Sequence, residues 1–271
     1  MAEPLHASWM WPATGLPAGV RVVFTSREGG VSEAPFDTFN LGDHVRDEAL
    51  AVAANRSRLQ EALGAKPVFL KQVHGTGVAL LTPAMPDGTE ADACVSDQPG
   101  SACAIMVADC LPVVFAHASG KVVAAAHAGW RGLASGVLER CFDTFVEAVW
   151  RAEPGTTRAE IAQHTWVWLG PCIGPNAFEV GYEVKRAFVA LNADDGACFE
   201  GAPGNASKWL ANLSGLARLR LQRLGLTGLQ GNDGSTEWCT VSQPSKFFSH
   251  RRDAAALGST GRMAACIWIE A

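Results

Sequence analysis

Three consecutive apolar runs, each the length of a β-strand, lie near the middle of the sequence. They cover Ala102–Val107, Leu111–His117 and Val122–His127, and the last two are joined by Ala118–Lys121. This connection, Ala-Ser-Gly-Lys, is short and contains glycine, which favours a hairpin between antiparallel strands. The runs therefore predict the core of a β-sheet, and an apolar sheet must be covered by other elements.

A segment with helical periodicity follows this predicted sheet. Apolar residues recur at spacings of three and four from about Leu133 to Trp150, so the segment should be a helix whose apolar face packs on the sheet. This order places His127 at the end of a strand. It also places Arg131 near the N-terminus of a helix, where the peptide dipoles favour anions.

Further elements are predicted on both sides of this centre. A helix should begin after an N-cap at Asp47 and end at Gly64. The other segments are strands at Val20–Thr25, Val68–Val73, Val78–Leu81, Trp166–Leu169, near Leu226 and at Arg262–Ile269, helices at Tyr182–Leu191 and Leu210–Leu224, and a loop at Pro154–Arg158. No repeat or linker divides the chain. We therefore expect one α+β domain over residues 1–271, a layered sandwich of mixed β-sheets covered by helices.

The composition disfavours several classes of protein. Of the 271 residues, 48% are hydrophobic and 18% are charged, which is enough apolar material for a sizeable core. A net charge of -5 at pH 7 disfavours binding to a nucleic-acid backbone. Neither a secretory signal nor an apolar run of about 18 residues is present. We therefore expect a cytoplasmic protein without nucleic-acid or membrane partners, in which most of the eight cysteines are reduced.

Three side chains with metal-binding chemistry stand at the ends of apolar runs. His127 opens the sequence His-Ala-Gly-Trp-Arg-Gly, Cys110 lies in Ala-Asp-Cys-Leu-Pro, and His74 lies in Lys-Gln-Val-His-Gly. Each residue alone is ordinary, because a histidine beside glycine is often a turn residue and a cysteine in an apolar run is often packing. Together, two imidazoles and one thiolate suit zinc, and three protein ligands leave a position open, as in catalytic sites.

Charged residues near these ligands have several interpretations. Asp109 is a candidate to orient a ligand imidazole, to accept a proton or to cap a turn. Arg27 and Arg131 lie in glycine-containing loops that let a guanidinium approach a phosphate or carboxylate, although solvated surface arginines look the same. The run Phe248–Asp253 is either an anion contact or a charged loop, and Trp130 and Phe248 are candidates to stack on a base.

Several well-known motifs are absent from the sequence. It contains no G-x-x-x-x-G-K-[ST], G-x-G-x-x-G, H-E-x-x-H or G-x-S-x-G. Pro171-Cys172 begins like half of a nucleobase deaminase motif, but the second cysteine and the H-x-E are missing. Seven histidines without a His-x-His pair cannot supply the multi-copper cluster of a true laccase.

A set of motifs along nearly the whole chain resembles one known family. These motifs are T-S-R-E-G-G-V-S and F-N-L-G-D-H-V within residues 25–45, K-Q-V-H-G at 71–75, A-D-A at 91–93, A-D-C-L-P-V at 108–113, A-A-H-A-G-W-R-G at 125–132, L-G-P-C-I-G-P and E-V-G-Y-E-V within 169–184, and F-F-S-H-R-R-D and G-R-M-A near the end. In this order they resemble the YfiH family, whose members carry the labels laccase-domain or polyphenol oxidase. The family fold is a layered α+β sandwich related to a group of proposed cysteine hydrolases.

The resemblance implies a zinc-dependent enzyme acting on small molecules. It implies phosphate-dependent cleavage of adenosine, inosine, guanosine and methylthioadenosine to the free base and a ribose 1-phosphate, with adenosine deamination as a second activity. We expect a monomer or weak homo-oligomer, with copper able to replace zinc in vitro. The implied metal ligands are His74, Cys110 and His127, the catalytic residues are Cys110, Asp109 and His127, and the substrate-binding residues are Arg27, Asn40, Gln72 and Arg131.

Three alternative functions stay open at this point. Cys110 as a thiolate nucleophile activated by His127 would attack an amide or ester without a metal. A second alternative is an accessory module, or an editing enzyme that hydrolyses a nucleotide-linked cell-wall precursor. A copper-dependent polyphenol oxidase is the third, because copper binds N and S ligands tightly.

Overall fold

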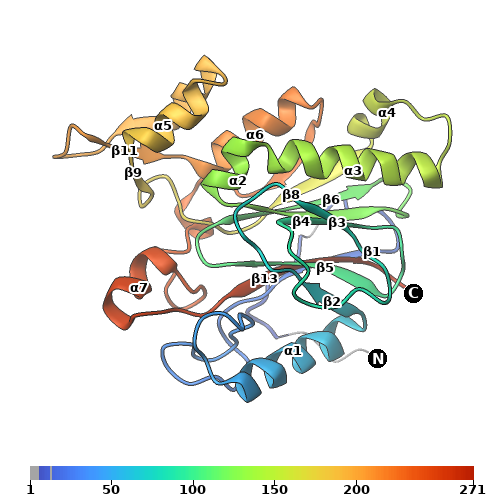
Figure 1. Ribbon diagram of the computed structural model, residues 1–271, viewed down its shortest axis with the longest axis horizontal. Coiled ribbons are helices and arrows are strands. Elements are labelled where there is room, and N and C mark those ends of the chain that lie inside the picture. The colour runs from blue at the N-terminus through green and yellow to red at the C-terminus, as the bar shows by residue number, and fades with distance from the viewer. Residues whose placement is uncertain (1–5, 13) are drawn as a thin grey trace.

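Two β-sheets stacked face to face form the centre of the molecule, with helices on the outer face of each (Figure 1). The computed structural model describes residues 6–12 and 14–271. The first sheet has the order β12-β8-β6-β7-β4-β3 and the second β1-β13-β5-β2. Both sheets contain parallel and antiparallel pairs, so the predicted layered α+β sandwich of mixed sheets is confirmed.

The first sheet contains the predicted hairpin. Its strands are β12 (Gly228–Gly231), β8 (Thr165–Leu169), β6 (Leu111–His117), β7 (Val123–Ala128), β4 (Ala93–Ser96) and β3 (Val78–Leu80). β6 and β7 pair antiparallel, with Leu111 opposite Ala128. The second sheet consists of β1 (Val20–Phe24), β13 (Met263–Ile269), β5 (Ser101–Val107) and β2 (Lys66–Phe69).

The three central apolar runs are divided between the two sheets. β5 belongs to the second sheet and β6 to the first, so the short segment Ala108–Cys110 crosses from one layer to the other. Every residue of β5, β6 and β7 is buried, because each sheet is covered on both faces. This explains why these strands read as continuous apolar runs rather than as alternating patterns.

Alternate residues of each strand contribute to different core layers. Ile105 of β5 packs between the sheets with Val114 of β6. Ala104 of β5 packs instead beneath the helix on the other side, and Phe115 of β6 packs under the helices above the first sheet. A large apolar side chain buried in this way contributes about 1.5–3 kcal/mol.

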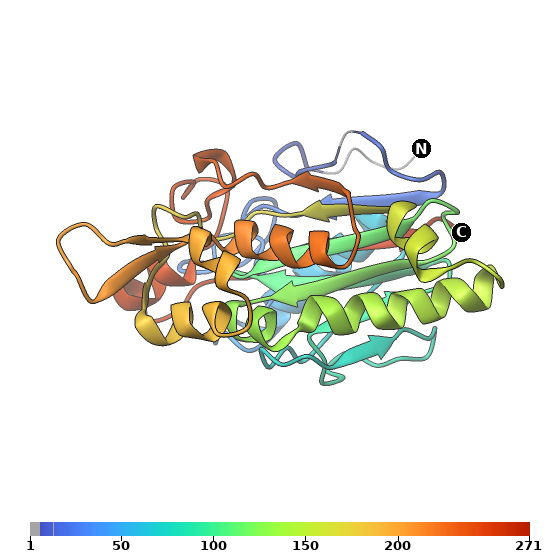
Figure 2. The same cartoon turned by 90° about the horizontal axis from the view of Figure 1, so that it is seen from above.

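The helices cover the outer faces. α1 (Ala49–Leu63) covers the second sheet, and α3 (Val137–Ala152) lies beside α6 (Leu213–Arg223) over the first sheet (Figure 2). α1 ends at Gly64 in the left-handed conformation, as predicted. The N-cap at Asp47 was wrong, because the cap is Glu48, and Asp47 accepts hydrogen bonds from Ser32 and Asn40 instead.

The single helix predicted from Leu133 to Trp150 is two helices. α2 (Trp130–Ser135) ends and α3 begins at Gly136, whose φ of 95° interrupts the helical backbone. The apolar spacing continues across the break, so periodicity alone could not reveal it. Arg131 does lie in the first turn of α2, and His127 does lie near the end of β7, as predicted.

Several other elements differ from the sequence-based expectation. α4 (Arg158–Gln163) begins where a loop was expected, because Thr157 and Glu160 form a capping box. α7 (His250–Leu257) includes part of the run Phe248–Asp253, for which a charged loop was one of two interpretations, and α6 starts at Leu213 because β11 precedes it. The remaining elements are α5 (Tyr182–Val189), β9 (Glu179–Gly181), β10 (Phe199–Gly201), β11 (Lys208–Ala211), and the 3₁₀ helices η1 (Ala193–Cys198) and η2 (Thr236–Trp238).

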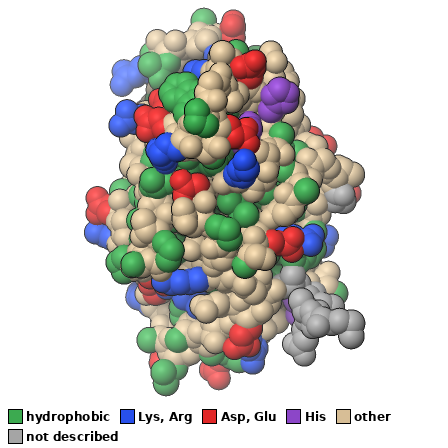
Figure 3. All heavy atoms as spheres, turned by 90° about the vertical axis from the view of Figure 1, so that its right-hand side faces the viewer, with side chains coloured by type: hydrophobic (Ala, Val, Ile, Leu, Met, Phe, Trp, Pro, Cys, Tyr) green, Lys and Arg blue, Asp and Glu red, His purple; other side chains and the backbone are tan. Residues whose placement is uncertain are grey.

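The surface carries charged side chains of both signs. On the face shown in Figure 3, positive and negative side chains are interspersed among apolar ones. In the part of the chain that the structure describes, no helix is long and apolar enough to cross a membrane.

Candidate metal centre

Three potential metal ligands from separate segments converge at one end of the two sheets. His74 follows β2, Cys110 ends the crossing between β5 and β6, and His127 lies in β7. Their ligand atoms all lie within 4.8 Å of one another. Cys110 Sγ is 3.7 Å from His74 Nε2. Two such ligands on one tetrahedral zinc are about 3.6 Å apart, so the donor set and its spacing fit zinc.

A buried carboxylate orients two of these ligands. Asp92 Oδ1 accepts a hydrogen bond of 2.8 Å from His127 Nδ1, which leaves Nε2 of His127 as its metal-binding atom. The same carboxylate accepts backbone N–H bonds from His74 at 2.9 Å and Gly75 at 2.6 Å. Asp92 therefore fixes one ligand by its side chain and the other by its backbone.

Asp92 belongs to the A-D-A motif at 91–93, but no role was predicted for its carboxylate. It lies just before β4, which was itself not predicted. The one available signal was an acidic residue inside the apolar sequence Ala-Asp-Ala-Cys-Val. The carboxylate that orients a histidine is thus Asp92, and Asp109 does not have that role.

The backbone around the ligands is shaped to bring them close together. His74 has a φ of 60° and Asp109, next to Cys110, a φ of 90°, in the region that ordinary side chains rarely adopt. Gly129 lies against the ligands, since a Cβ there would be 2.8 Å from His74 Cδ2 and 2.9 Å from Cys110 Sγ. Glycine is required at this position because the two side chains occupy the space.

The electrostatic environment favours a thiolate. Although burial opposes ionisation, the neighbouring His127 and His74 lower the pKa of Cys110 to about 6. Burial also opposes the imidazolium, yet Cys110 and Asp92 together raise the pKa of His127 to about 9. Burial likewise favours the neutral acid at Asp92, but hydrogen bonds from His127 and Gly75 hold its pKa below the ordinary value.

The three ligands lie in the wall of a cavity of about 320 Å³. α2 and α7, at the left-hand end of the sheets in Figure 1, both contribute to this cavity. Its other walls combine aromatic, apolar and cationic groups. The lining residues besides the ligands are His44, Gln72, Met106, Val107, Ala108, Asp109, Trp130, Ile173, Phe178, His250, Arg251 and Arg262.

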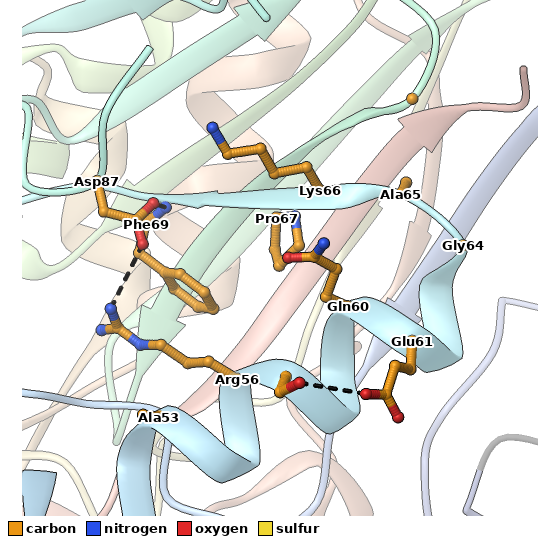
Figure 4. A pocket seen from close by; sticks show the side chains of 12 residues that line it. Ala53, Arg56, Gln60, Glu61, Gly64, Ala65, Lys66, Pro67, Phe69 and Asp87 are labelled. Carbon is orange, nitrogen blue, oxygen red and sulfur yellow. Dashed lines mark hydrogen bonds and ion pairs between the residues drawn. The ribbon is translucent and has the colours of Figure 1, made fainter. Parts of the chain in front are cut away.

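A larger cavity of about 710 Å³ lies between α1 and β2, away from these ligands (Figure 4). Its central cation is already neutralised, because Arg56 pairs with Asp43 and Asp87 and stacks 4.1 Å from the ring of Phe69. We place the functional site at the smaller cavity because the chemically reactive groups meet there.

The four predicted substrate-binding residues are not brought together. Gln72 lines the cavity, but its amide both donates to and accepts from the backbone of Met106, at 2.8 Å each. Asn40 is buried and binds backbone groups of its own loop and of Arg262. Arg27 pairs with Asp37 and donates to the Pro244 carbonyl.

The fourth predicted substrate-binding residue is Arg131, and two aromatic residues were candidates to stack on a base. Arg131 is exposed and stacks 4.5 Å from the ring of Trp130 without lining the cavity. Of the two aromatic candidates, Trp130 lines the cavity, whereas Phe248 is fully buried beneath Arg27.

Asp109 lines the cavity and anchors α7. Its carboxylate accepts hydrogen bonds from Thr240 Oγ1 and, at 2.6 Å, from the backbone N–H of Arg251. This corresponds to the capping interpretation. The polar residues that sequence reasoning missed at the cavity are His44 and Arg262, which come from segments distant in sequence from the ligands. His250 and Arg251, which also line it, belong to the run Phe248–Asp253 that was considered as an anion contact.

Comparison with known proteins identifies the family. A family model described as multi-copper polyphenol oxidoreductase laccase matches residues 21–270. The chain belongs to this family. The resemblance to YfiH proteins is thereby confirmed, because the relatives below include proteins of that name. The family's description names several copper ions, whereas in residues 6–12 and 14–271 one group of three metal-ligating side chains meets.

Relatives in this family are similar over nearly their whole length. The chain is 45% identical to a purine nucleoside phosphorylase of Pseudomonas aeruginosa, covering 97% of this chain and 99% of the relative. It is 44% identical to the purine nucleoside phosphorylase YfiH of Escherichia coli, covering 96% of each. A solved Neisseria meningitidis protein, 39% identical, superposes with a TM-score of 0.85 over 97% of this chain and 100% of that chain.

Proposed function

We propose that this protein is a zinc-dependent purine nucleoside phosphorylase. It would cleave adenosine, inosine, guanosine and methylthioadenosine with phosphate to the free base and a ribose 1-phosphate. The observation that carries the proposal is the convergence of His74, Cys110 and His127 in the wall of a cavity. Its support comes from relatives named purine nucleoside phosphorylase at 45% and 44% identity.

The metal ligands in this proposal are His74, Cys110 and His127. A thiolate and two imidazoles suit zinc, and a carboxylate behind a ligand histidine is a common feature of zinc sites. When bound, zinc supplies a Lewis acid that polarises a substrate atom or a water molecule. Copper binds the same donors and would compete in vitro.

The phosphate, the ribose and the purine base need different surroundings in the site. A phosphate oxygen forms a bond to ribose C1′, the bond from C1′ to the purine nitrogen breaks, and the base leaves with the electron pair and gains a proton. Trp130, Ile173 and Phe178 form an apolar wall suited to the flat base. Because negative charge develops on the base, hydrogen-bond donors and cations in the same cavity lower the barrier.

Further residue roles belong to the proposal. Cys110 and His127 act as ligands close to the reacting atoms, and Asp109, on the cavity wall, is the proposed proton carrier for a secondary deamination of adenosine. Arg27, Asn40, Gln72 and Arg131 stay predictions as substrate contacts. Among these four, Gln72 lines the cavity.

The test is a product analysis with zinc-loaded, copper-free protein. Adenosine is incubated with and without phosphate, and adenine, inosine, hypoxanthine and ribose 1-phosphate are separated by chromatography. We expect phosphate-dependent adenine and ribose 1-phosphate, with some inosine. A Cys110→Ala variant should lose both zinc and turnover. Adenine formation that does not depend on phosphate would contradict a phosphorylase.

A metal-free cysteine hydrolase is the second candidate, and one observation favours it. In this candidate, Asp92 orients His127, His127 is the base, and Cys110 is the nucleophile. The Asp92 carboxylate accepts a hydrogen bond from His127, and the His127 imidazole lies beside the Cys110 thiol. Such an enzyme would keep full activity after chelation and lose it on alkylation of Cys110. Hydrolysis of a nucleotide-linked cell-wall precursor without nucleoside cleavage would favour this candidate over the phosphorylase.

A further inference from the structure

Arg262 is a cation in the cavity wall, and none of the residues that the structure describes forms an ion pair with it. It directly precedes β13 and lines the cavity together with Cys110 and the two histidine ligands. Two other partly buried arginines pair with carboxylates, Arg27 with Asp37 and Arg252 with Asp253. Arg218 instead donates to backbone carbonyls, such as that of Asn232. The guanidinium of Arg262 makes no ion pair with any residue that the structure describes, and its two hydrogen-bond acceptors are backbone carbonyls.

The surroundings hold this guanidinium in one orientation. Its Nη1 donates to the carbonyls of Thr260 at 2.9 Å and Gly261 at 3.1 Å, and the Arg262 backbone N–H donates to Asn40 Oδ1 at 2.8 Å. The aliphatic part passes over Gly42, where a Cβ would lie 2.7 Å from Arg262 Cγ. Of the guanidinium nitrogens, only Nη1 is used in contacts with the described part of the chain, which leaves Nε and Nη2 to donate to a ligand.

The arrangement fits recognition of a tetrahedral oxyanion. A guanidinium with two free N–H groups on one edge binds two oxygens of a phosphate at once. Burial lowers the pKa of Arg262, while the charges of Cys110 and Asp109 act in the opposite direction, so the cation is partly removed from water. An added anion would replace the lost hydration. His44 and Arg251 line the same cavity.

We propose that Arg262 binds the phosphate co-substrate through Nε and Nη2, with Asn40 and Gly42 as positioning residues. This inference rests on the proposed function and adds to it the group that holds the attacking anion. It also gives Asn40 a different role from direct substrate contact, because its side chain fixes the backbone of Arg262.

The experiment measures binding of inorganic phosphate and turnover separately. Calorimetry of the zinc-loaded protein with phosphate alone reports binding, and initial rates report the KM values for phosphate and adenosine. We expect Arg262→Gln to weaken phosphate binding and raise its KM about ten-fold or more, because two charge-assisted hydrogen bonds are lost. Zinc content and the KM for adenosine should change little. Arg262→Lys should restore part of the affinity.

Three further variants keep the proposal falsifiable. Gly42→Ala retains the charge but displaces the arginine stem, so it should also weaken phosphate binding. Arg21→Gln, at a remote exposed pair with Glu270, should match the wild type. Arg131→Gln tests the competing arginine, and a phosphate KM that rises with this variant but not with Arg262→Gln overturns the proposal.

Different results would overturn the phosphate site at Arg262 and the proposed phosphorylase function. Phosphate binding that is as tight in Arg262→Gln as in the wild type overturns the inference, whatever the turnover. Loss of zinc together with phosphate also overturns it, because Arg262 would then support the metal site. Phosphate binding that depends on Arg262, in a protein without phosphorolysis, counts against the proposed function and for the anion site.

Discussion

At the scale of single residues, the function of the candidate metal centre depends on groups behind the ligands. Asp92 accepts one hydrogen bond from the His127 imidazole and further bonds from backbone N–H groups around His74. Through these bonds one buried carboxylate sets the tautomer of one ligand and the loop conformation of another. The ligands alone would be too flexible to keep their spacing.

Asp92→Asn should weaken zinc binding. The amide keeps the shape of the side chain but replaces one acceptor oxygen by a donor, which opposes either the imidazole N–H or the backbone N–H groups. We expect zinc affinity to fall about 10–100-fold, as measured by competition with a chelator. An affinity equal to that of the wild type would show that the carboxylate does not orient the ligands.

Gly129→Ala should disturb the same site by a steric clash with the ligands. The added methyl group would lie closer than van der Waals contact to both His74 and Cys110, at 2.8 and 2.9 Å, so one ligand must move. We expect lower zinc content after dialysis, by metal analysis. Gly77→Ala is the matched control, because its nearest neighbour would be 3.6 Å from the new Cβ. Equal zinc content in the two variants would contradict the steric argument.

At the scale of elements, α7 is attached to the site by Asp109 and is stabilised locally by its own Asp253. Asp109 accepts the backbone N–H of Arg251, and Asp253 accepts hydrogen bonds from Arg252 and from the backbone N–H of Ser249. Since α7 supplies two lining residues of the cavity, the position of this short helix determines the shape of the cavity. Its sequence looks like a charged loop because the contacts that position it, such as those of Arg251 with Asp109 and Glu179, are with distant parts of the chain.

Asp253→Asn should destabilise the protein in a pH-dependent way. Burial favours the neutral acid at Asp253, but hydrogen bonds from Arg252 and Ser249 lower its pKa below 3.8. A lowered pKa in the folded state means that the carboxylate adds stability above 3.8, which is lost as the pH falls through the folded-state value. The variant should therefore be less stable by about 1–2 kcal/mol at pH 7.

Denaturant unfolding at several pH values checks this prediction. The stability difference between Asp253→Asn and the wild type should be largest at neutral pH and shrink below pH 4. Asp194→Asn, on the exposed surface, serves as the control with little effect at any pH. A difference that grows on acidification would have the wrong sign for a lowered pKa.

At the scale of the whole molecule, the candidate centre connects the two layers. Cys110 ends the crossing between the sheets, His127 belongs to the first sheet, and His74 follows a strand of the second. A metal held by all three would join segments that are distant in sequence. Because the unfolded chain cannot present this geometry, binding stabilises the folded state.

Removal of the metal should therefore lower the melting temperature. Zinc at about 100 times its Kd stabilises a fold by about 2.7 kcal/mol, which corresponds to several degrees in a domain of this size. Thermal unfolding with and without a chelator measures the change. Cys110→Ala should show no chelator-dependent shift, and an unchanged melting temperature of the wild type would argue against a metal held by all three segments.

Local sequence patterns were enough to predict the central strands, the sandwich class and the three ligand-type residues. These features are local, because apolar runs, a glycine turn and ligand chemistry can be recognised within a few residues of the chain. The same holds for the end of α1 at Gly64, where a left-handed residue is needed.

The sheet that each strand joins and the polar groups that meet follow from long-range packing instead. β5 and β6 look alike in sequence, yet they lie in opposite layers because the crossing between them lets each bury both faces. Asp92, Arg251 and Arg262 acquire their roles from partners far away along the chain. A carboxylate or guanidinium has no intrinsic signal for such a role, since its energy depends on its hydrogen-bond partners and its burial in the folded chain.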